Sequence, residues 1–340
     1  MTADLIIISE INDGSTNQVL EYLNYFGFTN YVRLNAEETV IIELIELTES
    51  GINIIINYQN KPVLFNKSKV IWYRRGDFKY QHRLLITDND NLNTQLNGFL
   101  RQEWIKLRDF ILSIIPYTGS GKLLGNIQDE IYCNKLSNLT IAGQIGFKIP
   151  QTIVTSSKER LKQFTEGKKK IITKPVSNIP TFKYKNESWC NRGNSIVKQS
   201  DIDNLNNLFY PLLVQEYIDK EFEIRVFFFD EIIFAMAIFS QNDSGTNVDY
   251  RNYNYSKPNR VVPIQLSATT NLNIRSLIRE LNVFSGSIDL IQHPSGQIYF
   301  LEINYFGQFD WLSHNCNYYI EQQIAEYILS CTSKASYLMQ

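Results

Sequence analysis

The sequence predicts a mixed α/β fold, with antiparallel hairpins of the α+β type in its later part. Three observations support this prediction. The short apolar run LIIISE at residues 5–10 is followed by NQVLEYLNYFG at residues 17–27, which has helical spacing. Residues 91–115 have the same helical spacing. Residues 219–239 and 287–304 each consist of two apolar runs around a polar turn, which is the pattern of a β-hairpin.

The composition is that of an ordinary globular protein. The 340 residues are enough for two or three domains. Hydrophobic residues make up 44% and charged residues 20%, and the formal net charge of -2 does not support a general nucleic-acid-binding function. No apolar segment is long enough to span a bilayer. We therefore expect neither nucleic acid nor a membrane among the partners.

Cysteine and histidine usage argues against a zinc site and a disulfide framework. None of the four cysteines has CxxC spacing to another, and there are only three histidines. Free thiols are typical of a reducing compartment. The N-terminal residues MTADLIIISE lack a basic segment and read as a first strand rather than a signal peptide. We expect a cytoplasmic protein.

The remaining elements follow from periodicity. Further strands or extended segments are expected at residues 31–37, 52–59, 67–75, 149–156, 168–176 and 211–218. Further helices are expected at residues 134–146, 156–164, 270–281 and 319–330. The polar stretch SNIPTFKYKNESWCNRGNS at residues 177–195 has no clear periodicity and reads as a loop.

Three oxygen-bearing side chains are expected on one face of the last hairpin. Glu302 and Asn304 are two residues apart in a strand, so both point to the same face. Counting outward from the HPSG turn places Asp289 within side-chain reach of Glu302. Apolar residues on both sides of each acid indicate a buried sheet rather than a solvated acidic surface. Mg²⁺ prefers such oxygen ligands together with phosphate oxygens, so this face is a candidate site for Mg²⁺ and a nucleotide.

Other residues are suited to the rest of a nucleotide. Lys174 closes the strand IITK and could reach a phosphate, as could Lys135 on its helix, although either alone is more often a surface lysine. The backbone of residues 215–218 could pair with an adenine edge, and Glu223 could accept ribose hydroxyl groups. Arg225 and Arg251 could stabilise a transferred phosphoryl group.

The common nucleotide-binding motifs are absent from the sequence. There is neither a Walker A motif nor a GxGxxG motif, and no nucleophile signature surrounds a Ser, His or Cys. Instead, the ordered set NKL…AGQIGFKIPQTIVT, IITKP, LLVQEYI, EIRV, DYRN, SIDL and FLEIN resembles the ATP-grasp superfamily, over about residues 128–329. The segments VIWYRRGDF and NYFGQFDWL are especially similar to the graspetide synthetase branch, which also resembles ribosomal-protein glutamate ligases.

The resemblance implies a fold and a reaction. It implies an N-terminal pre-grasp domain at residues 1–118, a central domain with a lid loop at 119–210 and a C-terminal grasp domain at 211–340. ATP would phosphorylate an Asp or Glu side chain of a ribosomal precursor peptide to an acyl phosphate. A Ser or Thr hydroxyl or a Lys amine would then attack it, giving an ester or an amide. A leader segment would dock on the enzyme, and the family resemblance suggests a homodimer.

The resemblance also implies residue roles, carried over by position. The residues expected to contact ATP are Lys135 and Lys174 at the phosphates, Gln215, Glu216, Tyr217 and Ile218 at the adenine, and Glu223 at the ribose. Asp289, Glu302 and Asn304 would hold Mg²⁺, and Arg225 and Arg251 would steady the γ-phosphate and the acyl phosphate. Glu221 is the alternative to Glu223, because the turn DKEFE permits either register.

Two segments allow two interpretations each. Many ATP-grasp proteins have a glycine-rich loop after the KP strand, whereas residues 177–195 contain one glycine, Gly193. This stretch is either a lid that orders with ATP and peptide, or a segment whose aromatic and basic residues hold substrate. The arginines of WYRR, Arg74 and Arg75, are either a solvated strand end or a contact for acidic residues of a peptide.

Three functions remain open at this point. The first is a peptide-cyclising ligase of the graspetide type. The second is an ATP-grasp ligase that adds a free amino acid to a protein or small-molecule carboxylate. The third is a non-catalytic nucleotide- and peptide-binding scaffold, against which the complete set of metal ligands and arginines argues.

Overall fold

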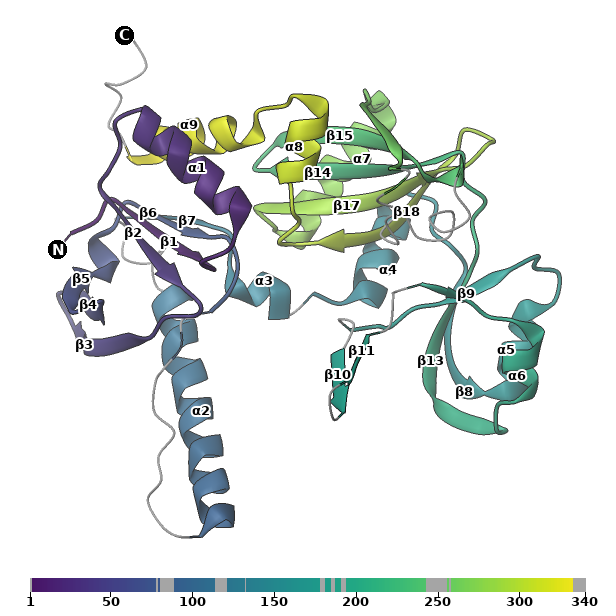
Figure 1. Cartoon of the computed structure of the whole chain (residues 1–340), viewed down its shortest axis with the longest axis horizontal. Coiled ribbons are helices and arrows are strands. Elements are labelled where there is room, and N and C mark those ends of the chain that lie inside the picture. Colours follow the sequence, from purple (N-terminus) through teal and green to yellow (C-terminus); the bar gives the residue numbers. More distant parts are fainter. Residues whose placement is uncertain are drawn as a thin grey trace. The chain divides into compact units, whose positions relative to one another are not determined.

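A computed structural model of the chain describes residues 2–77, 79, 89–113, 121–131, 133–177, 181–184, 187–190, 194–242, 256 and 258–332. The chain forms two compact units. The first unit comprises Met1–Tyr132, Gln308–His314 and Tyr318–Gln340, and the second comprises Cys133–Gly307 and Asn315–Asn317. Each unit has its own sheets and helices (Figure 1).

The first unit is built on a four-stranded parallel sheet in the order β2-β1-β6-β7. Its strands are β1 (Leu5–Ser9), β2 (Tyr31–Asn35), β6 (Val70–Tyr73) and β7 (Lys122–Leu124). All five residues of β1 are buried, because a central parallel strand is covered on both faces. Helices α1 (Gly14–Tyr25) and α9 (Ile320–Thr332) pack against each other, which joins the two ends of the chain in one unit.

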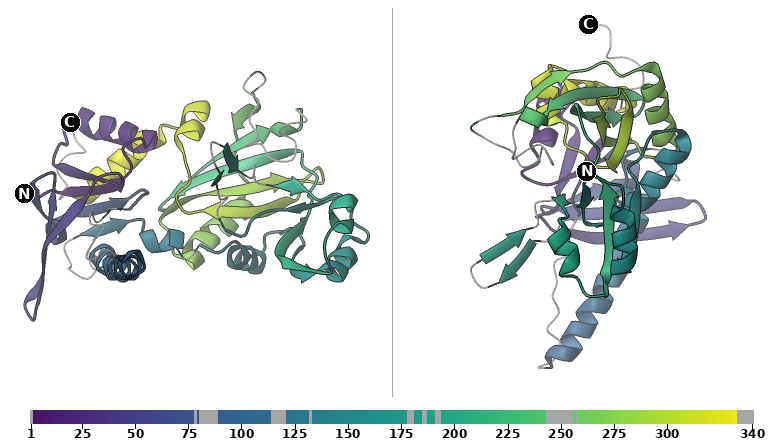
Figure 2. Two further views of the ribbon diagram at one scale, coloured as in Figure 1. Left: turned by 60° about the horizontal axis from the view of Figure 1, so that its bottom comes forward. Right: turned by 90° about the vertical axis from the view of Figure 1, so that its right-hand side faces the viewer.

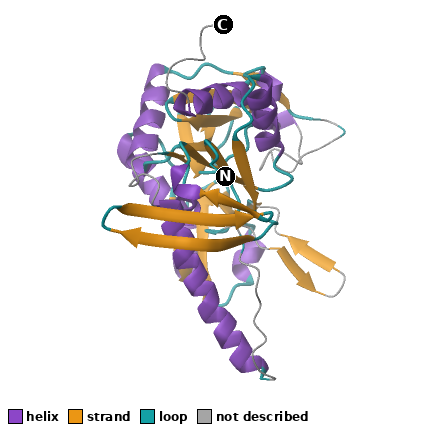
Figure 3. Cartoon of the chain, turned by 90° about the vertical axis from the view of Figure 1, so that its left-hand side faces the viewer, coloured by secondary structure: helices purple, strands orange, loops and turns teal. Residues whose placement is uncertain are grey.

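A second, antiparallel sheet of the first unit has the order β3-β4-β5 (Figure 3). Its strands are β3 (Val40–Thr48), β4 (Gly51–Tyr58) and β5 (Lys61–Leu64). The sequence predicts β4 but not β3 or β5. The register of β3 shifts between Ile42 and Leu44, which places an extra residue in the strand and breaks the alternation. Helices α2 (Asp90–Ser113) and α3 (Ile127–Ile131) complete this unit.

The second unit contains a four-stranded antiparallel sheet in the order β12-β9-β13-β8. Its strands are β8 (Thr152–Ser157), β9 (Ile171–Thr173), β12 (Ser195–Ile196) and β13 (Leu208–Glu216). Helices α5 (Lys158–Thr165) and α6 (Gln199–Asp203) cover it with Leu161 and Ile202. A separate hairpin, β10 (Thr181–Tyr184) and β11 (Glu187–Cys190), lies within the stretch that the sequence predicts as a loop.

The largest sheet has five antiparallel strands in the order β16-β15-β14-β17-β18 (Figure 2). Its strands are β14 (Phe222–Phe229), β15 (Ile232–Phe239), β16 (Arg260–Pro263), β17 (Ser285–Gln292) and β18 (Ile298–Asn304). Helices α4 (Lys135–Ile145) and α7 (Ala268–Leu281) form a hydrophobic core with one face of it. Both hairpins predicted from the sequence are confirmed, and Asp230 at the first turn has a positive φ of 50°. The short helix α8 (Asp310–Cys316) follows β18.

Helix α4 has a clear signal at each end. The Asn134 side chain accepts hydrogen bonds from the backbone N–H groups of Leu136 and Ser137, at 2.9 and 3.2 Å. Gly146 ends the helix with a φ of 114°, a left-handed conformation that favours glycine. The predicted helix at residues 134–146 and its end at Gly146 are therefore confirmed.

The two units do not coincide with the three expected domains. Helix α9 belongs to the first unit, whereas the expected grasp domain at residues 211–340 would include it. The three-part division stays a prediction. Among the helices that the structure describes, none combines the length and apolarity needed to cross a membrane.

We predict that Asn134→Ala lowers the free energy of unfolding by about 1 kcal/mol, because two N–H groups at the start of α4 lose their acceptor. Denaturant unfolding followed by circular dichroism measures the change. Asn134→Asp keeps an acceptor and should retain most of the stability; equal losses in both variants would contradict the capping role.

Candidate active site

The expected face of the last hairpin is present, and a β-bulge shapes it. Asp289 on β17 is paired with Glu302 on β18, and the register shifts at the next position, where Leu290 is paired with Phe300. Leu301 is therefore the extra residue. Phe300 and Ile303 both belong to the hydrophobic core, whereas Leu301 and Glu302 line a cleft on the other face. Bulges commonly re-aim side chains next to active sites.

Asp289 is almost fully buried, and it has a positively charged partner. It lies opposite Arg225 of β14, and Arg225 Nη1 donates to Asp289 Oδ1 at 2.8 Å. Both residues are 8% exposed. The guanidinium stabilises the ionised carboxylate, which would be costly to bury alone. A buried carboxylate oxygen at this position can serve as a ligand for a hard cation.

Asn304 lies at the end of β18, beside a tightly packed turn. It is paired with Ser287, and the Gly307 N–H donates to the Asn304 carbonyl at 3.2 Å. A Cβ atom on Gly307 would lie 1.7 Å from Ser287 Oγ and 2.8 Å from the Ser287 backbone nitrogen. Only glycine therefore allows the turn to close against β17 at this point.

Most of the predicted nucleotide residues line a single cleft of the second unit. Its empty volume is about 670 Å³, including the part that is open to solvent. Eight of its lining residues are predicted site residues: Lys174, Gln215, Glu216, Tyr217, Ile218, Glu223, Asp289 and Glu302. The apolar side chains that line it include Pro150, Ile172, Ile291 and Leu301. The cleft thus combines an apolar wall with convergent charged groups.

The predicted adenine hinge lies where β13 ends. The Gln215 side-chain amide donates to Thr152 Oγ1 at 2.8 Å, whereas its buried Oε1 atom has no hydrogen-bond partner among the described residues. The backbone N–H and C=O of Ile218 likewise make no hydrogen bond in the described part of the chain. These groups are available to the polar edge of a base, so the hinge fits a nucleotide.

The two predicted phosphate-contacting lysines lie at the same side of the second unit. Lys135 Nζ donates to the carbonyl of Pro175 at 3.1 Å and lies 3.9 Å from Glu302 Oε2. Lys174 follows β9, is only 7% exposed and lines the cleft. A buried lysine beside an acidic cleft is not the solvated surface lysine that is the usual alternative.

Of the two alternatives for the ribose contact, Glu223 is the one that lies at the cleft. Glu223 is buried and lines the cleft, whereas Glu221 is exposed and is not among the lining residues. Sequence reasoning missed two partners of Glu223. Lys220 contacts one of its carboxylate oxygens and Ser240 donates to the other. A lysine in a polar turn gives no sequence signal of burial.

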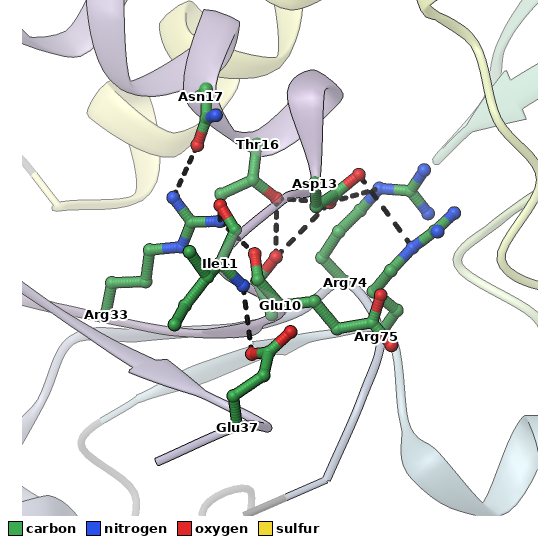
Figure 4. A network of polar contacts seen from close by, with 10 residues as sticks. Glu10, Ile11, Asp13, Thr16, Asn17, Arg33, Glu37, Arg74 and Arg75 are labelled. Atoms are coloured by element: carbon green, nitrogen blue, oxygen red, sulfur yellow. Dashed lines mark hydrogen bonds and ion pairs between the residues drawn. The ribbon is translucent and has the colours of Figure 1, made fainter.

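Three further predicted residues remain, one outside the described part of the chain and two in the first unit. Arg251 lies outside the described residues, as do parts of the loop at residues 177–195. In the first unit, Arg74 is 4% exposed, so the solvated strand end is wrong for this residue. Its Nε atom lies 3.6 Å from Asp13, Arg75 contacts the same carboxylate, and burial lowers the pKa of Arg74 to about 10 (Figure 4). A contact of these arginines with a peptide stays a prediction.

The donor set fits Mg²⁺ with a nucleotide. Two carboxylates and one amide oxygen follow one another on the β17–β18 hairpin. Among the described residues, no cluster of three or more His, Cys, Asp and Glu side chains is present. Few protein ligands are typical of Mg²⁺, which keeps waters and phosphate oxygens in its coordination shell.

Comparison with solved structures decides the fold. A RiPP-associated ATP-grasp ligase from Chryseobacterium gregarium, in complex with ADP and a leader and core peptide, matches with a TM-score of 0.82 and 22% identity, over 96% of this chain and 97% of that chain. The chain has the ATP-grasp fold. Macrocyclase MdnC from Microcystis aeruginosa MRC, bound with precursor peptide MdnA, matches with a TM-score of 0.76 and 26% identity, over 97% of this chain and 100% of that chain.

A further solved structure shares this fold. ATP-grasp ligase PsnB, complexed with a phosphomimetic variant of a minimal precursor, Mg and ADP, matches with a TM-score of 0.71 and 16% identity, over 97% of this chain and 99% of that chain. No protein-family model and no curated protein sequence matches the chain. The predicted resemblance to ATP-grasp ligases is confirmed, and the chain has the fold of these matched ligases.

We predict that Gly307→Ala lowers the free energy of unfolding by about 1–3 kcal/mol, because the new methyl group would displace Ser287 and the end of β18. Thermal unfolding followed by circular dichroism measures it. Gly98→Ala is the matched control, because Gly98 lies inside α2 with no atom within 4 Å of an added Cβ. It should be neutral or stabilising by up to about 1 kcal/mol, and similar losses in both variants would contradict the packing.

Proposed function

We propose that this protein is an ATP- and Mg²⁺-dependent macrocyclase that joins side chains of a ribosomally made precursor peptide. The observation that carries the proposal is the cleft, which gathers eight predicted nucleotide and metal residues in an ATP-grasp fold. The matched structures support the substrate class, because they are described with ADP, Mg and precursor, leader or core peptides. We expect the leader and core of one precursor peptide as the partner, and cytoplasmic location and a homodimer remain predictions.

The cleft residues would bind and orient ATP. The Gln215–Ile218 segment would receive the adenine, Glu223 would accept ribose hydroxyl groups, and Lys174 and Lys135 would lie at the phosphates. Asp289, Glu302 and Asn304 would hold Mg²⁺. When bound, Mg²⁺ neutralises charge that develops on the phosphate oxygens. Arg225 would orient Asp289 through its hydrogen bond and add positive charge near the transferred group, and Arg251 would add a second guanidinium.

The proposed reaction has two steps, phosphorylation of a carboxylate and ring closure. An Asp or Glu carboxylate oxygen of the peptide forms a bond to the γ-phosphorus while the bond to ADP breaks, giving an acyl phosphate. A Ser or Thr hydroxyl or a Lys amine then attacks the acyl carbon, loses its proton and expels phosphate. Each ring closed converts one ATP to ADP and phosphate and removes the elements of one water from the peptide. ATP supplies the activation, because ester formation is unfavourable in water.

We predict that a candidate precursor peptide, encoded by a gene next to that of this protein, loses the mass of one water per ring when it is incubated with this protein, ATP and Mg²⁺. Intact-mass spectrometry measures the change, and omission of ATP is the control. Mass gain by one amino acid would instead indicate a ligase that adds a free amino acid. Unchanged mass with every encoded candidate, despite tight ATP binding, would contradict the macrocyclase and favour a scaffold.

We predict that Glu302→Gln combined with Asn304→Ala lowers Mg²⁺-dependent ATP turnover by about 100-fold or more, because two of three metal ligands are lost. Coupled measurement of ADP release tests this across a Mg²⁺ titration. Glu280→Gln, a matched loss of charge on the exposed surface of α7, should retain wild-type turnover. Wild-type turnover in the double variant would remove both residues from the metal site.

A further inference from the structure

Lys220 is a buried lysine at the wall of the nucleotide cleft. Its side chain is 3% exposed, and the residue lines the cleft together with Tyr217, Ile218 and Glu223. Burying a lysine requires a partner, and the partner is the Glu223 carboxylate, whose side chain is 6% exposed. Such a pair is weak evidence for stability, because apolar residues of similar volume often replace a buried ion pair without loss. Because the pair lies at the cleft, it is better placed to serve ligand binding than stability.

The Glu223 carboxylate is held at both oxygens. Lys220 Nζ contacts Oε1, and Ser240 Oγ donates to Oε2. Ser240 is fully buried and follows β15, so the two contacts approach from different elements. The terminal torsion of a glutamate is otherwise broad. Two contacts on different oxygens therefore fix the plane of the carboxylate before any ligand binds.

The fixed carboxylate lies on the sheet face that carries the metal residues. Glu223 and Arg225 are two residues apart on β14, so both point to the same face, about 7 Å apart along the strand. Glu223 is paired with Ile291, and Arg225 with Asp289. Along the chain, Glu223 follows the hinge residues at 215–218 and precedes Arg225, which is paired with Asp289. In a nucleotide, the sugar lies between base and phosphates in the same order.

We propose that Lys220 and Ser240 are positioning residues that hold Glu223 as a preorganised acceptor for the vicinal hydroxyl groups of a nucleoside sugar. The cleft then selects ribonucleotides over 2′-deoxyribonucleotides. An ionised carboxylate only accepts hydrogen bonds, and sugar hydroxyl groups donate them. Fixing the acceptor in advance removes an ordering cost from binding, so a correctly placed hydroxyl contributes its full hydrogen bond. This inference rests on the proposed nucleotide-binding function.

The test compares Mg²⁺–ADP with Mg²⁺–2′-deoxy-ADP by isothermal titration calorimetry on the full chain. The wild-type protein should bind ADP about 10- to 100-fold more tightly, the contribution of a hydrogen bond to a charged group. Lys220→Met keeps a similar length without the charge, and its preference should fall to about 3-fold or less. Lys169→Met, the same change at an exposed lysine outside the cleft, should keep the wild-type preference.

The outcomes separate this inference from the proposed function. A wild-type protein that binds neither nucleotide overturns the proposed function and, with it, this inference. Binding of both nucleotides with equal affinity leaves the proposed function standing and overturns the selectivity. An unchanged preference in Lys220→Met overturns the positioning role of Lys220.

A second variant keeps the test decisive if Lys220→Met does not fold. Ser240→Ala removes one hydroxyl from the other side of Glu223 and leaves the ion pair in place. Its preference for ADP should fall below that of the wild-type protein while its thermal midpoint stays measurable. A wild-type preference in Ser240→Ala would show that the carboxylate needs no support and would overturn the proposal.

Discussion

Asp289 and Arg225 lie side by side on neighbouring strands of the five-stranded sheet, and Arg225 Nη1 donates to Asp289 Oδ1 at 2.8 Å. Each is 8% exposed, so each charged group has lost most of its contact with water. The attraction between the two charges offsets the free-energy cost of this lost hydration. The core beneath them, formed with α4 and α7, fixes the register of the two strands. This buried pair therefore sets where the Asp289 carboxylate meets the cleft, and Glu302 is paired with Asp289 on the neighbouring strand.

The bulge at Leu301 brings a second acidic side chain to the cleft. Because one extra residue is accommodated between Phe300 and Ile303, both core positions are kept and Glu302 is directed to the cleft beside Asp289. The cleft then continues along the sheet to Glu223 and the end of β13. A single sheet face, supported by one hydrophobic core, thus carries the groups proposed for the sugar and for the metal.

The sequence predicts the parts of this site that depend on strand periodicity. Alternation places Glu302 and Asn304 on one face, and counting from the turn places Asp289 within side-chain reach of Glu302; the structure confirms both expectations, and the bulge makes Glu302 the direct partner of Asp289. The sequence does not reveal the bulge at Leu301, because an extra residue in an apolar run does not change the visible pattern. The burial of Lys220 and its link with Ser240 depend on a contact between two strands, which local pattern does not encode. The packing of α9 against α1, about 300 residues apart in sequence, was missed for the same reason.

In the proposed reaction, a peptide carboxylate is activated as an acyl phosphate. The most direct test is isotope transfer: a precursor peptide labelled with ¹⁸O in its Asp and Glu side-chain carboxylates is incubated with this protein, ATP and Mg²⁺, and the released phosphate is analysed by mass spectrometry. We expect that each ring closed transfers one ¹⁸O atom from the peptide to phosphate, since the carboxylate oxygen bonded to phosphorus leaves with the phosphoryl group. Ring formation with unlabelled phosphate would contradict it.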